Sequence, residues 1–366
     1  MTRTGFGYNW HLADPRFDLA LNRKELNRFG WVVEIDPFDA ASTPVKRTAL
    51  GRIKHEGATV TEEDGKVVVY SGDDENGDYL YKFVGNAPWR RLRRQGKSPL
   101  DEGTLHVARF NADGSGTWIP LVFGTGPLTA ANGWADQADV LLRTRQAADA
   151  LVATKLDRPE WVAVNPLTKD VFVTLTNGTQ GPTPVNPRFP NIYGHIVRVT
   201  ENRDDPTQTA FAWGIFAYAG DPQYLPEGAF VPADQPLFGS PDGLWVDRDG
   251  RMWIQTDISN SSQNLASRKY DRIGNNAMLA ADPATGEIRR FLTGPRGCEI
   301  TGVITTPDQK TMFINIQHPG ESTPAFGAPT PANPRAVSNW PDYDAAGRPR
   351  AATVVIRKVG GGKIGT

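Results

Sequence analysis

A short pattern recurs four times in this chain of 366 residues. Each copy begins with a carboxylate, runs through a half-apolar segment and a polar turn, and ends in a second apolar segment. The carboxylates are Glu56, Glu160, Asp242 and Glu299, and a valine follows each of them four positions later (Val60, Val164, Val246 and Val303). Repeated short strand pairs are typical of a β-propeller, whose blades stack around a central channel.

The segments between the copies supply further strand pairs, with apolar residues bounded by Gly, Pro and Asp. After the second copy these pairs lie at residues 194–199 and 212–216, and after the third at 277–280 and 288–291. An inner hairpin followed by an outer hairpin makes a four-stranded blade. The sequence therefore predicts an all-β fold, an incomplete β-propeller of about four blades in a single domain over residues 1–366.

Four segments depart from this pattern. A strand pair at 31–35 and 45–50 precedes the first copy, and apolar residues at helical spacing predict one inserted helix within 134–154. The arginine-rich run 90–94 is predicted as a solvated loop. A Pro-rich loop is expected at 318–350.

Composition excludes several classes of protein. The 40 basic and 41 acidic residues give a net charge of −1, so no overall field would attract nucleic acid or an anionic membrane. The single Cys298 cannot form a disulfide within the chain. No apolar run approaches the roughly 18 to 20 residues of a membrane span, and residues 1–5 contain no apolar export signal.

The repeated carboxylates predict a metal-binding site. The same position in successive blades faces the same channel, so the four carboxylates should converge. Like charges that lie close together repel one another, and bound cations relieve this; carboxylate oxygens suit Ca²⁺, or iron where the geometry is tighter. The second strands end in further candidate ligands, among them Asp257. The alternative is that these acids only accept hydrogen bonds from neighbouring blades. The predicted metal ligands are Glu56, Asp73, Asp74, Glu160, Asp242 and Glu299.

Three further residues are candidates for contact with a substrate. Arg158 stands two positions before Glu160, and its guanidinium could bind a phosphate through two hydrogen bonds or form a salt bridge to one of the same acids. His195 could serve as a proton carrier, although a lone histidine is more often hydrogen-bonded within a structure. Asn276 could reach a substrate or belong to a turn before a strand.

Several motifs together resemble the PhoX-type bacterial alkaline phosphatases, in the family's order over nearly the whole chain. The motifs lie at residues 27–37, 54–58, 158–160, 193–196, 240–244 and 298–302. The resemblance implies a six-bladed propeller whose channel holds Fe³⁺ and Ca²⁺, and a periplasmic or secreted enzyme that hydrolyses phosphate monoesters. It also implies that Glu56, Glu160, Asp242 and Glu299 bind metal, with an acid of the Asp73–Asp74 pair. Arg158 and Glu160 would then be catalytic, and Arg158 would hold the phosphate.

The chain differs from the family pattern at its N-terminus. Family members carry an export signal, early blades and a Cys-Glu-Glu motif that are not among these residues. We therefore expect an N-terminally truncated member with most calcium and phosphate ligands but an incomplete iron site. A complete propeller would be monomeric, whereas an open one exposes sheet edges that favour self-association. The alternatives are a calcium-dependent propeller lactonase and a non-catalytic propeller.

Overall fold

The computed structural model describes residues 8–225 and 230–366, which form 18 strands in four sheets. The smallest sheet pairs β1 (Val33–Glu34) with β2 (Val45–Lys46) in an antiparallel hairpin. This hairpin is shorter than the sequence predicts, because residues Thr48–Leu50 form a 3-10 helix (η4) in place of strand. The sequence predicts no export signal at residues 1–5, and these residues lie outside the ranges that the structure describes.

The largest sheet has nine strands and contains two of the predicted blades. Strands β3–β6 correspond to the first predicted blade and β8–β11 to the second, and β7 pairs with β11 to join their outer edges. The sheet curls until its edge strands meet, since the Thr59 hydroxyl of β3 donates to the Val162 carbonyl of β8 over 2.5 Å. In sheet order the strands are β3 (His55–Glu63), β4 (Lys66–Asp73), β5 (Leu80–Gly85), β6 (Gly103–Phe110), β7 (Ser115–Pro120), β11 (Ala210–Tyr218), β10 (His195–Glu201), β9 (Val171–Leu175) and β8 (Pro159–Val164).

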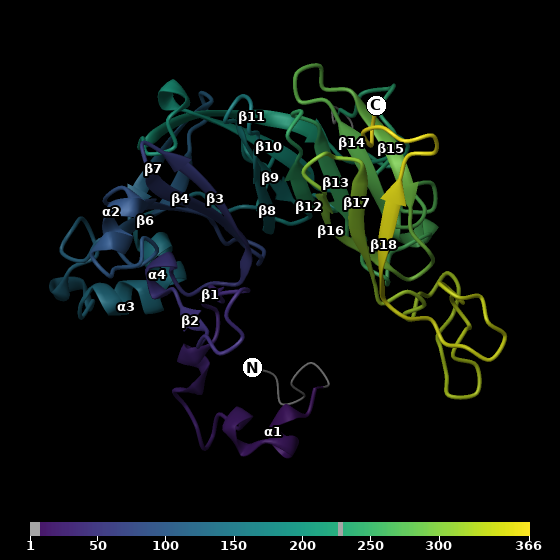
Figure 1. Ribbon diagram of the computed structural model, residues 1–366, viewed down its shortest axis with the longest axis horizontal. Coiled ribbons are helices and arrows are strands. Elements are labelled where there is room, and N and C mark those ends of the chain that lie inside the picture. The colour runs from purple at the N-terminus through teal and green to yellow at the C-terminus, as the bar shows by residue number, and fades with distance from the viewer. Residues whose placement is uncertain (1–7, 226–229) are drawn as a thin grey trace.

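Two smaller sheets complete the arrangement. The sheet that corresponds to the third predicted blade has four antiparallel strands in chain order: β12 (Pro241–Val246), β13 (Met252–Thr256), β14 (Ala277–Ala281) and β15 (Ile288–Thr293). The sheet that corresponds to the fourth has three: β16 (Glu299–Thr305), β17 (Thr311–Gln317) and β18 (Ala352–Arg357). Figure 1 shows the sheets along an arc, with β3, β8, β12 and β16 on its inner side. The predicted all-β, propeller-like architecture is therefore confirmed.

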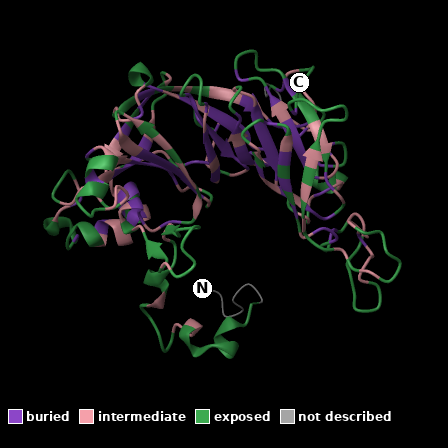
Figure 2. Ribbon diagram, viewed as in Figure 1, coloured by how far each residue is buried: buried purple, intermediate pink, exposed green. Residues whose placement is uncertain are grey.

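Apolar side chains fill the space between successive sheets. Between the second and third blades, Phe172 and Ile196 pack against Leu244 and Ile254. Between the third and fourth, Trp253 packs with the apolar side chains of β16 and β17. Figure 2 shows that the buried residues concentrate in these strands, while the described N-terminal segment and the loop after β17 are mostly exposed or half-buried. Face-to-face packing of the sheets thus fixes the spacing of the inner strands.

The helices differ from prediction in two places. The segment expected to form one helix contains two, α3 (Gln137–Leu142) and α4 (Thr144–Ala150), because Arg143 leaves helical geometry at ψ 40°. The arginine run predicted as a loop is helix α2 (Trp89–Arg94), which buries Leu92 and leaves its arginines exposed. The remaining helices are α1 (Trp10–Ala13), η2 (Pro15–Phe17), η3 (Glu25–Arg28), η5 (Ala130–Asn132), η6 (Asn202–Asp204) and η7 (Ala266–Arg268).

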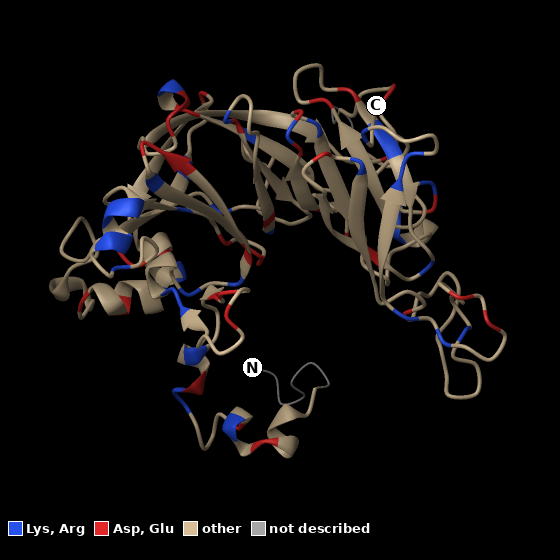
Figure 3. Ribbon diagram, viewed as in Figure 1, with Lys and Arg blue, Asp and Glu red and all other residues tan. Residues whose placement is uncertain are grey.

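Charges of both signs are spread over the molecule (Figure 3). Between β17 and β18, residues 318–351 contain neither helix nor strand and extend from one end of the fourth sheet (Figure 1). Within the described ranges, no helix has the length and apolar character needed to cross a membrane.

Candidate metal centre

Each of the four inner strands carries its repeated acid close to a β-bulge. The pairing register shifts between Glu56 and Thr59 in β3, and the equivalent shifts lie at 159–162 in β8, 241–244 in β12 and 301–303 in β16. A bulge bends its strand and redirects the side chains around it. The bulges therefore help to turn the acids toward a common volume, which strand alternation alone would not do.

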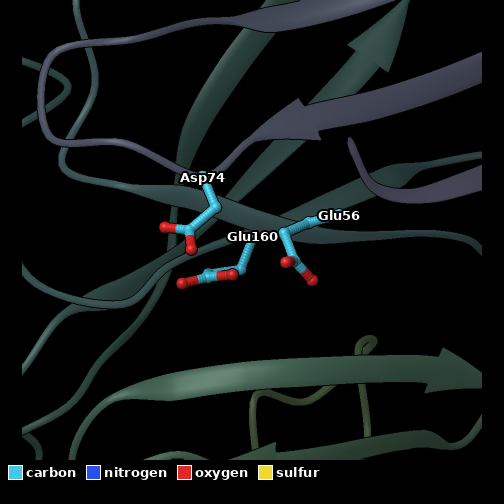
Figure 4. Close-up of side chains that lie close together, drawn as sticks. All are labelled: Glu56, Asp74 and Glu160. Carbon is cyan, nitrogen blue, oxygen red and sulfur yellow. The ribbon is translucent and has the colours of Figure 1, made fainter. Parts of the chain in front are cut away.

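One group of three carboxylates joins the first and second blades. Oxygens of Glu56, Asp74 and Glu160 all lie within 4.8 Å of one another, and Figure 4 shows their side chains together. Gly72 permits this approach, since a Cβ at its position would lie 2.2 Å from the Glu160 carbonyl oxygen. Without a side chain there, β4 packs directly on β8 and delivers Asp74, just beyond its end, to Glu160.

A second group joins the third and fourth blades. Oxygens of Asp242, Asp257 and Glu299 also lie within 4.8 Å of one another. The Gln317 amide donates to Glu299 over 2.7 Å, and His318 Nε2 lies 3.6 Å from the same carboxylate. In contrast, the buried Oδ1 atom of Asp242 has no hydrogen-bond partner among the described residues. A buried carboxylate oxygen without a donor is a position that a cation would satisfy.

The two groups lie close enough to influence each other electrostatically. Burial, reinforced by Asp74 and Glu299, raises the pKa of Glu56 to about 7. Burial raises the pKa of Glu160 far above its ordinary value, and Asp242 and Asp74 add to that rise. The pKa of Asp242 is likewise raised by burial and by its neighbours Asp257 and Glu299. The six carboxylates therefore form one cluster, in which the charges of the ionised forms are only partly compensated.

Arg158 is the guanidinium that contacts this cluster. Its Nε and Nη2 atoms donate to the two oxygens of Asp74 over 2.8 and 3.0 Å, and Nη2 lies 2.8 Å from Glu160 Oε1. The salt bridge considered for Arg158 is thus present. One guanidinium and one histidine cannot balance six carboxylates, so the donor set fits divalent or trivalent cations with a preference for hard oxygen ligands.

Three predicted site residues lie outside the cluster. Asp73 is fully buried and accepts hydrogen bonds from the Lys54 amide (2.9 Å) and from Arg145 Nε (2.7 Å). Successive side chains of an extended strand point to opposite faces, so the backbone that delivers Asp74 to the cluster directs Asp73 away from it.

The other two are His195 and Asn276, whose polar atoms are used within the fold. The His195 ring nitrogens contact the Val185 carbonyl (2.8 Å) and the Asn191 amide (3.0 Å). The Asn276 amide donates to the Ile258 and Cys298 carbonyls and accepts from Ile258 N and the Thr256 hydroxyl. Both side chains are completely buried, so neither faces a substrate here.

Asp257, one of the candidate ligands expected where the second strands end, also belongs to the cluster. It directly follows β13, as Asp74 directly follows β4. An acid just after the second strand of a blade is therefore the signal that identifies it.

Comparison with known proteins places these features in context. The family model described as alkaline phosphatase PhoX matches residues 1–320. The structure of Pseudomonas fluorescens PhoX in complex with vanadate, a transition state analogue, is 46% identical, with a TM-score of 0.86. That match covers 98% of this chain and 62% of the other, so the chain spans less than two thirds of its relative's length.

Other structures are far less similar. A glycoside hydrolase family 43 protein from Bacillus licheniformis is 13% identical over 73% of this chain and 48% of its own, with a TM-score of 0.29. A search of curated proteins found no match. The family-model match and the 46% identity agree with the motifs in the sequence, and the chain belongs to the PhoX alkaline phosphatase family.

Proposed function

We propose that this chain hydrolyses phosphate monoesters at the carboxylate cluster, with Ca²⁺ and Fe³⁺ as its metal ions. The observation that carries the proposal is the convergence of six carboxylates from three sheets around one guanidinium. The family supports the same activity, since the related Pseudomonas fluorescens enzyme binds vanadate, a transition state analogue.

The proposed metal ligands are the six carboxylates of the two groups. Their oxygens are hard ligands suited to Ca²⁺ and Fe³⁺. Bound cations would neutralise charge on phosphoryl oxygens and lower the pKa of water. Glu160 is the most buried residue of the six. The placement of Glu160 and Asp242 at bulges would fix the positions of the cations relative to the substrate. The ligand set is Glu56, Asp74, Glu160, Asp242, Asp257 and Glu299.

Arg158 would orient the phosphate. Its Nε and Nη2 atoms are engaged by Asp74 and Glu160, whereas no hydrogen bond from Nη1 to any described residue is found. The side chain remains 30% exposed. Because the other two nitrogens hold the guanidinium plane in place, Nη1 could donate to a phosphoryl oxygen without further ordering of the side chain.

The number of blades, the oligomeric state and the cellular location are also proposals. The inner strands β3, β8, β12 and β16 would each belong to one blade of a propeller that has six in the family, which their arrangement along an arc supports. The complete propeller would act as a monomer in the periplasm or outside the cell. Exposed sheet edges in an open arc would favour self-association.

Hydrolysis of p-nitrophenyl phosphate, compared with that of a simple lactone, tests the activity directly. We expect phosphate release that requires added Ca²⁺ and Fe³⁺, and Glu160→Gln should lower kcat/KM by more than about 100-fold. Glu287→Gln is the matched control, since Glu287 is exposed beside Arg289 on the third blade. Undiminished phosphatase activity in chelator, or hydrolysis of the lactone alone, would contradict the proposal.

A further inference from the structure

A pocket of about 440 Å³ lies at the loops that follow and precede the ligand-bearing strands. Its lining includes Asn76 from the first blade, Thr179 from the second, and Ser240, Ser259, Ser262 and Arg268 from the third. The pocket therefore spans three of the four blades that contribute to the carboxylate cluster.

Chain connectivity places the pocket directly beside the cluster. Three lining residues are separated by only two positions from candidate ligands: Asn76 from Asp74, Ser240 from Asp242, and Ser259 from Asp257. Two residues of extended chain reach no more than about 7 Å. A phosphate held at the cluster would thus leave the rest of its ester within reach of this pocket.

Hydrogen bonds between blades fix the walls of the pocket. The Asn76 amide donates to the Thr179 hydroxyl over 2.8 Å, and the Thr179 backbone N–H donates to the Asn76 side-chain oxygen over 3.0 Å. On the opposite side, the Tyr270 hydroxyl lies 3.1 Å from the Ser240 hydroxyl. Tyr270 stands two positions after Arg268, so this contact holds the Arg268 segment against the start of β12. The pocket is therefore preformed.

The lining mixes apolar surface with hydrogen-bonding groups, and its charge has one sign. Most of the lining residues carry a hydroxyl or amide group, although the lining exposes more apolar than polar surface. Arg268 is the charged residue, and no carboxylate is among the residues that line the pocket. Arg268 is exposed, and it forms no ion pair with any residue in the described ranges. A cation of this kind, set among hydrogen-bonding groups, suits a ligand that combines hydroxyls with an anionic group.

We propose that this pocket binds the alcohol portion of the phosphate monoester and favours alcohols that carry a second anionic group, a carboxylate or a phosphate, held by Arg268. This inference rests on the proposed phosphatase activity and adds to it a class of substrate. The cluster would hold the phosphate that is cleaved, and Arg268 would hold the anionic group at the far end of the same molecule.

Two substrates that differ in one group provide the test. 3-Phosphoglycerate carries a carboxylate where glycerol 3-phosphate carries a hydroxymethyl group. We expect the enzyme with its metals bound to prefer 3-phosphoglycerate, and Arg268→Gln to lower the ratio of the two kcat/KM values about fivefold. Arg268→Glu should reverse the preference. Because Arg268 is exposed, the preference should also weaken as ionic strength rises.

Arg94→Gln is the matched control, because Arg94 is an exposed arginine on α2 of the first blade. It should leave the ratio unchanged. Equal ratios for the wild-type enzyme and both Arg268 variants would overturn the inference while leaving the phosphatase activity established. If neither substrate nor p-nitrophenyl phosphate is hydrolysed, the proposed function itself fails, and the role of the pocket fails with it.

Discussion

Arg158 has a left-handed backbone conformation, with φ of 50°, which few residues that carry a Cβ adopt. Its N–H donates to the Leu156 carbonyl, and its carbonyl accepts from the Thr176 N–H, so the surrounding chain holds it in place. Strained residues held in this way are often found at functional sites. Here the conformation accompanies a guanidinium that contacts both Asp74 and Glu160.

We predict that Arg158→Lys raises the KM for p-nitrophenyl phosphate at least about tenfold. Lysine keeps the charge but lacks the planar fork that holds Asp74 while leaving another N–H group for the phosphate. Steady-state kinetics measure the effect, and Arg143→Lys, on the helical segment, serves as the control. Unchanged KM and kcat would show that Arg158 acts only as a structural ion pair.

His195 is the residue for which we predict a pH effect on stability. Burial lowers its pKa from 6.5 to about 4, so the folded protein favours the neutral ring. The contribution of the neutral His195 ring to the free energy of unfolding is fully present above the unfolded-state pKa near 6.5, and it is lost as the pH falls toward 4. Between pH 7.5 and 5 this amounts to about 2 kcal/mol of unfolding free energy.

Urea unfolding of the wild-type protein and His195→Gln at these two pH values isolates that contribution. The variant should be less stable at pH 7.5, and the difference between the two proteins should shrink at pH 5. A difference that stays constant with pH would contradict the assignment.

At the scale of elements, a buried charge pair connects the first two blades. Lys82 on β5 lies 3.0 Å from Glu201 on β10, and both side chains are almost completely buried. The Tyr70 hydroxyl and the Trp118 indole also donate to Glu201, over 2.6 and 3.1 Å. The carboxylate is therefore satisfied by groups from β4, β5 and β7, and it ties β10 to the first blade.

We predict that Lys82→Met lowers the free energy of unfolding by about 3–5 kcal/mol, because it leaves a buried carboxylate without its cation. Adding Glu201→Gln removes that charge but keeps an acceptor for Tyr70 and Trp118, so the double variant should recover part of the loss. Chemical denaturation of the wild-type protein, the two single variants and the double variant measures the interaction as a double-mutant cycle. If the losses of unfolding free energy in the two single variants simply add up in the double variant, the two side chains do not interact.

Strand identity could be predicted from the sequence because apolar alternation and turn residues mark each strand locally. The joining of two blades into one sheet could not, since β7 and β11 pair residues such as Thr117 and Ala210 that lie far apart in the chain. The break at Arg143 and the helical turn around Leu92 depend on packing, which no local pattern records. Local signals thus define elements, and tertiary contacts decide how they join.

Some residues of the candidate site could also be predicted from the sequence, and others depend on tertiary contacts. The repeat identifies Glu56, Glu160, Asp242 and Glu299, because a repeated acid in a repeated blade must face one channel. It does not distinguish Asp73 from Asp74, since that choice depends on which face of β4 meets β8. His195 and Asn276 lie in motifs of the family but serve the fold, and only their buried hydrogen bonds reveal this.

At the scale of the whole molecule, the cluster joins parts of the chain that are distant in sequence. Glu56 and Glu299 stand on the first and last of the four inner strands, yet Glu299 contributes to the raised pKa of Glu56. The interaction requires the three sheets that carry the inner strands to keep their places along the arc (Figure 1). Cations at the centre would therefore stabilise the arrangement of the sheets as well as act on phosphate.

Anomalous diffraction from crystals grown with Ca²⁺, Fe³⁺ and vanadate tests this account most directly, because it locates the cations relative to the carboxylates. We predict metal peaks about 2.0–2.6 Å from oxygens of both groups, Glu56–Asp74–Glu160 and Asp242–Asp257–Glu299, with vanadate contacting Arg158 Nη1. Metal-free carboxylates in such crystals, or vanadate bound away from Arg158, would contradict it.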